Sequence, residues 1–373
     1  MRKTLLAALF LLFSCHKAQP PVSQPAPVTA FRIEPQTIPA DFEFIGVGES
    51  SHIVQLRARV EGYLESIHYK EGGLVKQGDL MFVLDQRPFI AAVESAKGML
   101  DRQKAILWNA EQTKARMVPL YAKNAVSQKD LDNALAQVLA AQAEVETASA
   151  DLYKAEINLG FTSVSAPVTG LASQAKYREG ALIAPNAGDE NLLTTIYVVD
   201  PIWVNFSISD NDLLQLKRDV ANKRVEFPPE MQFKVEAILS DGTVVPAVGS
   251  IDFTNPAIQQ STGTMLFRSV MSNPKTLIYP GQFVKVIVKG AIRPNAIAVP
   301  QTAVLQGGNG TFVYVIENGK ALSRSVEAGE WYKDYWIINS GLKEGDVVVA
   351  QGVNKIQQGK PVSIHTLLSG QLP

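Results

Sequence analysis

The sequence has only one cysteine, Cys15, and only four histidines in 373 residues. A lone cysteine forms no intrachain disulfide, and the histidines are scattered as His16, His52, His68 and His365, so solvated or satisfied side chains are expected rather than metal ligands. The formal net charge of −1 leaves no basic footprint for nucleic acid. Phosphate loops, G-x-S-x-G elbows and H-E-x-x-H motifs are also missing. We therefore predict a protein that is not an enzyme, uses no cofactor or metal, and has no nucleic acid partner.

Long apolar runs are scarce as well. Residues 5–13 form one after Arg2 and Lys3, but it is shorter than the roughly 20 residues that span a bilayer. Residues 12–15, Leu-Phe-Ser-Cys, resemble the lipobox of a bacterial lipoprotein signal, although Phe13 is bulkier than the usual occupant. We predict a signal peptide over residues 1–14, a lipid on Cys15 and a Pro-rich tether over residues 15–30. An uncleaved apolar anchor is the alternative. The protein is expected in the periplasm, lipid-anchored, with the anchor in the inner membrane.

An internal repeat organises the folded part of the chain. Residues 58–75, ARVEGYLESIHYKEGGLV, align without a gap with residues 166–183, APVTGLASQAKYREGALI. Both copies indicate a strand, a glycine turn, a second strand and a Glu-Gly before a third. The matches are Ala58/Ala166, Val60/Val168, Gly62/Gly170, Tyr69/Tyr177, Glu71/Glu179, Gly72/Gly180 and Leu74/Leu182. Neither copy can bury its own apolar face, so we expect one β-sandwich whose shared core contains Val60, Leu64, Leu74, Val168, Ala172 and Leu182.

These two halves resemble the lipoyl or biotinyl carrier domain, in which two β-halves meet at a hairpin that carries a modified lysine. Here the chain instead leaves at residues 84–86 for a helical insertion and returns at residues 159–161. The resemblance implies a split lipoyl-like domain, residues 52–86 and 160–196, without its cofactor. A carrier-type enzyme subunit remains an alternative, but Lys76 and Lys176 lie away from the expected apex.

The insertion, residues 87–159, has the seven-residue period of a coiled coil. Its first arm places Val93, Leu100, Leu107 and Lys114 at one position and Ala96, Gln103, Ala110 and Met117 at the other. Its second arm repeats Leu131, Val138, Val145, Leu152 and Leu159, with Ala134, Ala141, Ala148 and Ala155 between them. The link at residues 124–126 is short enough to require an antiparallel α-helical hairpin, about 45 to 55 Å long. The outer faces are mostly polar, which favours a projecting hairpin over one folded back on the body.

Two β-rich stretches complete the chain. Residues 197–290 predict a small antiparallel β-barrel with strands near 233–239, 244–253, 265–271 and 282–289 and one short helix capped by Ser209 or Asp210. Residues 291–366 predict a second β domain, and residues 31–51 are expected to complete it.

The order of these parts resembles the periplasmic adaptors, or membrane fusion proteins, of resistance-nodulation-division (RND) efflux pumps. Local matches are Ser261-Thr262-Gly263-Thr264 with Arg268, LIYPGQF at 277–283, AVPQ at 298–301 and GLKEGD at 341–346. The family implies a mainly β fold with a long coiled-coil hairpin, a split lipoyl-like β-sandwich, a small antiparallel β-barrel and a β-rich membrane-proximal domain. It also implies a ring of protomers that links an inner-membrane proton-driven transporter to an outer-membrane channel for export of drugs or other small molecules. The alternative hypothesis among adaptor proteins is an adaptor of an ATP-driven exporter.

The resemblance also singles out the hairpin tip. Arg116, Leu120 and Ser127 have the R-x3-L-x6-S spacing with which similar adaptors engage the outer-membrane channel. Each has a structural alternative: Ser127 with Asp130 is a good helix start, Leu120 could extend the seam, and Arg116 could be solvated. Pro119 is expected to disturb the helix between Arg116 and Leu120.

Overall fold

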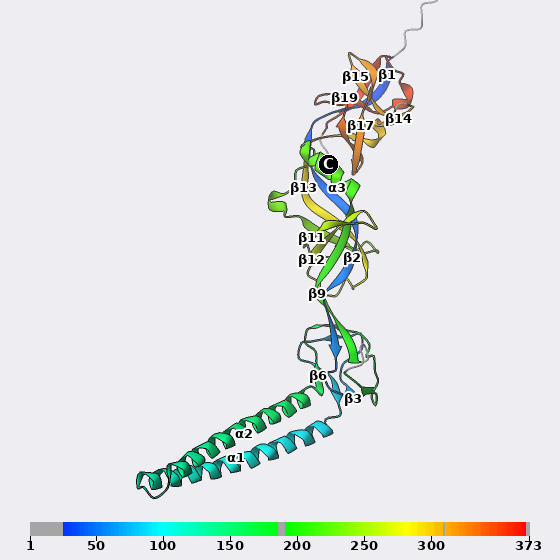
Figure 1. Cartoon of the computed structure of the whole chain (residues 1–373). Helices are drawn as coiled ribbons and strands as arrows, with labels where there is room; N and C mark the ends of the chain where they lie inside the picture. Colours follow the sequence, from blue (N-terminus) through cyan, green and yellow to red (C-terminus); the bar gives the residue numbers. More distant parts are fainter. Residues whose placement is uncertain (1–24, 186–190, 309, 371–373) are drawn as a thin grey trace, which may run out of the picture. The chain divides into compact units, whose positions relative to one another are not determined.

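The computed structural model describes residues 25–185, 191–308 and 310–370 (Figure 1). Cys15, the expected signal peptide and most of the expected tether lie outside the described residues. The chain forms two compact units, one made of Asp41–Leu213 and Gln232–Lys289, the other of the described residues up to Ala40, Leu214–Met231 and the chain from Gly290 onward. Among the described residues no helix has the length and apolar character needed to cross a bilayer.

The two repeats build one β-sandwich by exchanging their strands. The first strand of each copy pairs antiparallel with the last strand of the other, so that Gly62 lies opposite Ile183 and Gly170 lies opposite Val75. The strands are β3 (Gly62–Ile67), β4 (Leu74–Val75), β5 (Leu80–Leu84), β6 (Ser163–Ser165), β7 (Gly170–Ala172) and β8 (Leu182–Ile183). Because each half completes the other, neither can close its hydrogen bonds alone.

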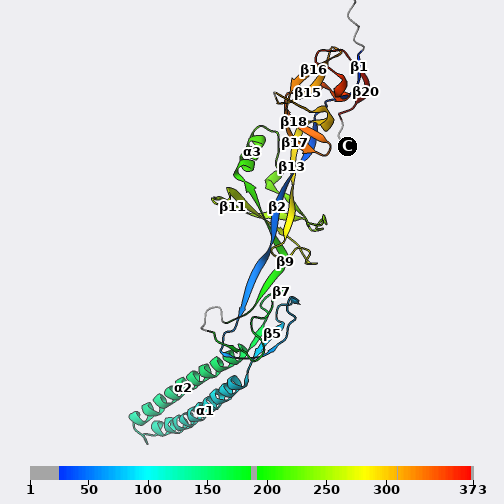
Figure 2. The same ribbon diagram turned by 90° about the vertical axis from the view of Figure 1, so that its right-hand side faces the viewer.

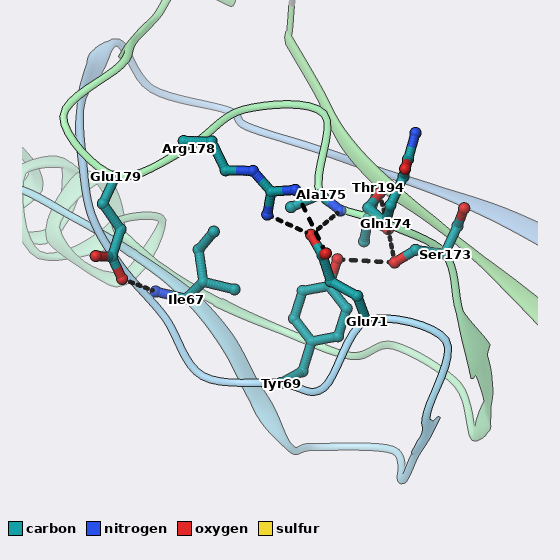
Figure 3. Close-up of polar contacts among 9 residues, drawn as sticks. All are labelled: Ile67, Tyr69, Glu71, Ser173, Gln174, Ala175, Arg178, Glu179 and Thr194. Carbon is teal, nitrogen blue, oxygen red and sulfur yellow. Dashed lines mark hydrogen bonds and ion pairs between the residues drawn. The ribbon is translucent and has the colours of Figure 1, made fainter.

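Polar contacts repeat this exchange at equivalent positions of the two copies (Figure 3). A carboxylate oxygen of Glu71 accepts a hydrogen bond from the Ala175 N–H at 2.8 Å, and Glu179 accepts one from the Ile67 N–H at 3.1 Å. Glu71 also forms an ion pair with Arg178 at 2.6 Å, and hydrogen bonds from Arg178 and Ala175 lower the pKa of Glu71. The repeated glutamates therefore fasten each repeat to the other.

The sandwich core differs from the expected one at two positions. Leu64 and Ala172 are 1% exposed, and Val60 and Val168 pack at the edge of the same cluster, as predicted. Leu74 and Leu182 are instead 62% and 51% exposed, so their assignment to the core is wrong. The next residues, Val75 and Ile183, are buried in their place. Successive side chains of a strand point to opposite faces, and the repeat alone does not say which of two adjacent apolar residues faces inward.

The helical insertion is a hairpin of two long antiparallel helices, α1 (Arg87–Ala122) and α2 (Gln128–Gly160), which lie side by side in both views (Figures 1 and 2). Every buried residue described in the two helices lies on the predicted seam: Leu100, Ala110, Ala134, Val138, Ala141 and Ala148. The small alanines let the helices approach closely, and Ala110 packs against Val138 and Ala141. The predicted coiled-coil hairpin is confirmed.

The start of α1 is held by the residues that follow β5. Asp85 accepts hydrogen bonds from the Arg87 backbone N–H at 3.1 Å and from its guanidinium at 2.8 and 2.7 Å. These bonds lower the pKa of Asp85 to about 2. Pro88 then occupies the first turn, where no backbone N–H is needed.

The β-barrel is closed by six strands, and one of them comes from far upstream. Each strand pairs with two neighbours in the cyclic order β2 (Gln36–Arg57), β9 (Leu192–Ser209), β12 (Thr264–Met271), β11 (Gly249–Gln259), β10 (Lys234–Ile238) and β13 (Phe283–Pro300). Phe42 and Phe44 of β2 pack against the barrel core, where Phe44 stacks on Phe206 at 5.5 Å between ring centroids. Residues 41–51 therefore belong to the barrel unit rather than to the membrane-proximal β domain expected for 31–51. Closure of the sheet removes its edges, which explains why the barrel needs the extra strand.

Several residues of the matched barrel segment are structural. The Arg268 guanidinium donates to Asp252 at 2.8 Å and lies 4.0 Å from the centroid of Trp203. Asn273 is buried, and its side-chain amide bonds the carbonyls of Val199 and Ile278. The short helix α3 (Asp210–Ala221) begins after Ser209, whose hydroxyl accepts a hydrogen bond from the Asp212 N–H at 3.1 Å.

The remaining unit is a β domain in which β1, from the N-terminal part of the chain, pairs with strands near the C-terminus. β1 (Ala26–Arg32) pairs antiparallel with β19 (Val347–Gln351) and parallel with β20 (Val362–Leu368). Val28 and Ala30 are buried, so the expected tether over residues 15–30 ends before Ala26. The prolines at 25 and 27 predicted a tether, but Pro27 sits at the start of the strand, where proline is tolerated. The other strands are β14 (Leu305–Gly307), β15 (Gly310–Glu317), β16 (Lys320–Ser325), β17 (Glu327–Tyr332), β18 (Tyr335–Ser340) and the end of β13.

Candidate functional site at the hairpin tip

The loop between α1 and α2 is short and tightly hydrogen-bonded. The Lys123 and Ala125 N–H groups donate to the Leu120 carbonyl at 3.1 and 3.0 Å, and Asn124 takes a left-handed conformation with φ of 55°. Asparagine tolerates this conformation better than most residues. The tip is thus a defined turn that can hold neighbouring side chains in place.

Ser127 begins α2 through a reciprocal capping box. Its hydroxyl accepts a hydrogen bond from the Asp130 N–H at 3.2 Å, while the Asp130 carboxylate accepts from the Ser127 N–H at 3.2 Å and from its hydroxyl at 2.7 Å. These bonds from Ser127 lower the pKa of Asp130. The helix-start interpretation of Ser127 is therefore present in the structure, and its hydroxyl is already engaged within the chain.

Arg116 and Leu120 lie on one flank of α1. α1 continues through Pro119 to Ala122, so the disturbance expected at the proline does not end the helix between Arg116 and Leu120. With Leu107 and Lys114 at heptad position a, Arg116 falls at c and Leu120 at g, which are adjacent on the helix surface. Arg116 is exposed, with one guanidinium nitrogen 3.3 Å from the Thr113 hydroxyl, and Leu120 is 40% exposed. Leu120 therefore does not extend the buried seam.

The structure brings only two of the three predicted residues together as one surface. Arg116 and Leu120 present a cation beside an apolar side chain, a combination suited to binding another protein. Ser127 bonds Asp130 in the capping box, which fixes the start of α2.

One tip residue was missed by the sequence analysis. The Tyr121 hydroxyl donates to the Gln128 side-chain oxygen at 2.8 Å and so joins the last turn of α1 to the first turn of α2. Tyr121 occupies the next a position after Lys114, and extending the seven-residue period by one step would have found it.

The described residues also include possible metal ligands. No group of three or more His, Cys, Asp or Glu side chains in the described ranges could hold a metal ion. His68 bonds the Ser66 hydroxyl at 2.8 Å, an exposed local contact.

Comparison with known protein families gives three matches that follow the order of the fold. Residues 92–162 match the alpha-helical hairpin domain of RND MFPs, and residues 201–291 match the beta-barrel domain of RND MFPs. Residues 296–364 match the C-terminal permuted SH3-like domain of YknX.

Full-length relatives match nearly the whole chain. The efflux pump periplasmic linker BepD of Brucella suis is 32% identical over 95% of this chain and 91% of its own length. The multidrug efflux pump subunit AcrA of Escherichia coli K12 is 32% identical over 90% of this chain and 84% of its own. Among solved structures, MacA from Actinobacillus actinomycetemcomitans has a TM-score of 0.57 and 23% identity, covering 86% of this chain and 98% of that one, which supports the fold alone.

Proposed function

Because the chain belongs to the periplasmic adaptor, or membrane fusion protein, family of RND efflux pumps, we propose that its hairpin tip binds the outer-membrane channel of a tripartite pump. The adaptor would join that channel to an inner-membrane proton-driven transporter for export of drugs or other small molecules. The observation that carries the tip assignment is the exposed Arg116 and Leu120 pair on one flank of α1.

The same proposal covers where the protein acts and how it is held. As an adaptor it acts in the periplasm without a catalytic site of its own. We propose that Cys15 carries the lipid, that the anchor is in the inner membrane, and that protomers associate as a ring. We also propose a division into a hairpin, a split lipoyl-like domain, a barrel that includes part of β2, and a membrane-proximal β domain that includes β1.

The alternative of a swinging-cofactor carrier is disfavoured by the path of the chain. β5 leads through Asp85 into α1, so the place of the carrier hairpin is taken by the helical insertion. The family match to RND adaptors likewise favours a proton-driven partner over an ATP-driven exporter.

The tip is tested by reversing its charge. Arg116→Asp and Leu120→Asp should each abolish drug efflux in cells. The first reverses the charge that the tip offers to the channel, and the second puts a negative charge in place of an apolar side chain. Protein level and copurification with the transporter should persist. Lys217→Asp, a charge reversal at an exposed site of α3 outside the hairpin, is the matched control and should retain efflux.

Variants of Ser127 separate capping from contact. Ser127→Ala removes the capping box and should cost about 1 kcal/mol of hairpin stability, while Ser127→Asn can still cap. If Ser127→Asn pumps normally, Ser127 acts by starting α2. Normal efflux in Arg116→Asp and in Leu120→Asp would remove the tip from the proposal.

A further inference from the structure

The two flanks of the hairpin carry exposed apolar side chains that the coiled-coil seam does not use. Heptad positions b and e face one side of the hairpin and positions c and g face the other, here called the b/e flank and the c/g flank. On the b/e flank, Trp108, Leu139 and Tyr153 are 64%, 69% and 65% exposed. On the c/g flank, Met99 and Ile106 are 50% and 49% exposed. Both flanks of the helix pair therefore offer apolar side chains that a partner could cover.

The two flanks differ in shape. The c/g flank has a groove of about 520 Å³ between the helices, lined in part by the small residues Ala92, Ser95, Ala96 and Ala148, and Arg102 lines it together with the acidic residues Glu144 and Asp151. The b/e flank presents Tyr153, an aromatic side chain, to solvent. A groove on one flank and an exposed aromatic side chain on the other suit a head-to-tail contact between identical chains.

The charges at these positions are complementary in one register. Position c of α1 is occupied by Ser95, Arg102, Asn109 and Arg116, and position b of α2 by Tyr153, Glu146, Leu139 and Asp132. When position c of α1 in one copy lies antiparallel to position b of α2 in the next copy, Arg102 faces Glu146 and Arg116 faces Asp132. The same register sets Tyr153 against Ser95. A shift of one heptad in either direction loses both opposite-charge pairs.

This register also keeps neighbouring hairpins level. Tyr121 and Gln128 lie opposite each other within one hairpin, since their side chains are hydrogen-bonded. Moving the same number of residues away from the tip along both helices, starting from Tyr121 and Gln128, places Arg102 beside residue 147 and Ser95 beside residue 154. Glu146 and Tyr153 are each one residue away from these positions. A second copy at the same height therefore satisfies the charge pairs, and a head-to-tail contact without an axial step can close into a ring when the rotation between copies divides a full turn.

We propose that the b/e flank of α2 in one copy packs on the c/g flank of α1 in the next copy, with Tyr153 over the groove and Glu146 beside Arg102. This inference rests on the ring of protomers in the proposed function and names its contact surface. The apolar residues supply most of the affinity, whereas the exposed ion pairs contribute little energy and select the register. In the described part of the chain neither Arg102 nor Glu146 makes an ion pair within 4 Å, and Arg102 shares its groove with Glu144 and Asp151.

Cysteine crosslinking tests the contact in the full-length membrane-anchored protein. The native chain has Cys15 as its only cysteine, so new disulfides report on the introduced sites. The variant carrying both Ser95→Cys and Tyr153→Cys should give a ladder of dimers, trimers and higher species on mild oxidation, because each copy offers both halves of the contact. A control with Ser95→Cys and Leu135→Cys, in which the second cysteine lies nearer the tip, should give none. Dimers from Ser95→Cys alone would mean a two-fold contact and would overturn the proposal.

A charge exchange tests the register. In the cysteine-pair background, Arg102→Glu or Glu146→Arg should reduce the ladder several-fold, and the two together should restore it. Restoration between different chains is expected when cells coexpress the two single variants, because only an intermolecular pair can be rebuilt that way. A ladder unaffected by all these changes overturns the proposed register.

The outcome is separable from that of the proposed function. An absent ladder with normal efflux sinks this interface and leaves the adaptor role standing. Arg116 belongs to both proposals, and Arg116→Asp combined with Asp132→Arg distinguishes them. If the combination restores the ladder but not efflux, Arg116 also contacts the channel. If it restores both, the effect of Arg116→Asp on efflux arises in the ring.

Discussion

Adjacent residues in the strands of the sandwich alternate between buried and exposed. Substitutions at neighbouring positions are therefore expected to destabilise the fold by different amounts. Ile183 is fully buried, whereas Leu182 is 51% exposed. Ile183→Ala should destabilise the sandwich by roughly 2 to 5 kcal/mol, because it removes buried methylene groups and leaves a cavity. Leu182→Ala should change stability by less than about 0.5 kcal/mol.

Hydrogen exchange is the suitable measurement, because unfolding of a chain with several domains is not a two-state process. Amides of β3 and β7 should lose protection in Ile183→Ala and keep it in Leu182→Ala. Equal protection in the two variants would contradict the observed inward face of β8.

At the scale of the helices, the hairpin separates residues that stabilise it from residues that other chains can contact. Val138 is 9% exposed on the seam and Leu139 is 69% exposed on the b/e flank. Val138→Ala should cost the hairpin about 1 to 2 kcal/mol, because the lost methyl groups outweigh the better helix propensity of alanine. Leu139→Ala should leave a dilute monomer unchanged.

Helical circular dichroism on heating should show this contrast in dilute detergent-solubilised protein. At concentrations that favour association, Leu139→Ala should weaken assembly, as seen by analytical ultracentrifugation. Loss of helicity in dilute Leu139→Ala would place that side chain in the fold rather than on a contact surface.

The sequence predicted the elements with strong periods and missed the choices that depend on the whole fold. The heptad of α2 predicted its buried face because alanines and larger apolar residues repeat over several turns. The repeat predicted a two-part sandwich, but the assignment of Leu74 rather than Val75 to the core was wrong, because a two-residue strand is too short to show which residues face inward. The helix-start interpretation of Ser127 followed from local chemistry, since the capping box needs only Asp130 three residues later.

Across the whole chain, each β domain is assembled from segments far apart in sequence. The barrel takes β2 as well as the strands after residue 192, and β1 pairs with the last strands of the chain. The sequence predicted strands in residues 31–51 but assigned all of them to one domain, since alternation of apolar residues does not say which sheet a strand joins. β2 is 22 residues long, and pairing with both β9 and β13 decided its place in the barrel.

The proposed membrane attachment of the whole molecule rests on a segment outside these domains. Among the described residues no helix could cross a bilayer, and Arg2, Lys3 and the apolar run before Cys15 have the features of a lipoprotein signal. We predict that Cys15→Ser leaves an uncleaved or mislocalised precursor, because lipid attachment to the cysteine precedes cleavage at this type of signal. Detergent phase partitioning of wild-type protein should place the mature chain in the detergent phase, with mass spectrometry showing acyl groups on Cys15. Ser14→Ala, which keeps a small residue before the cysteine, is the matched control and should be processed normally. Mature wild-type protein in the aqueous phase with an unmodified Cys15 would defeat the prediction and leave the uncleaved apolar anchor as the way the chain is held at the membrane.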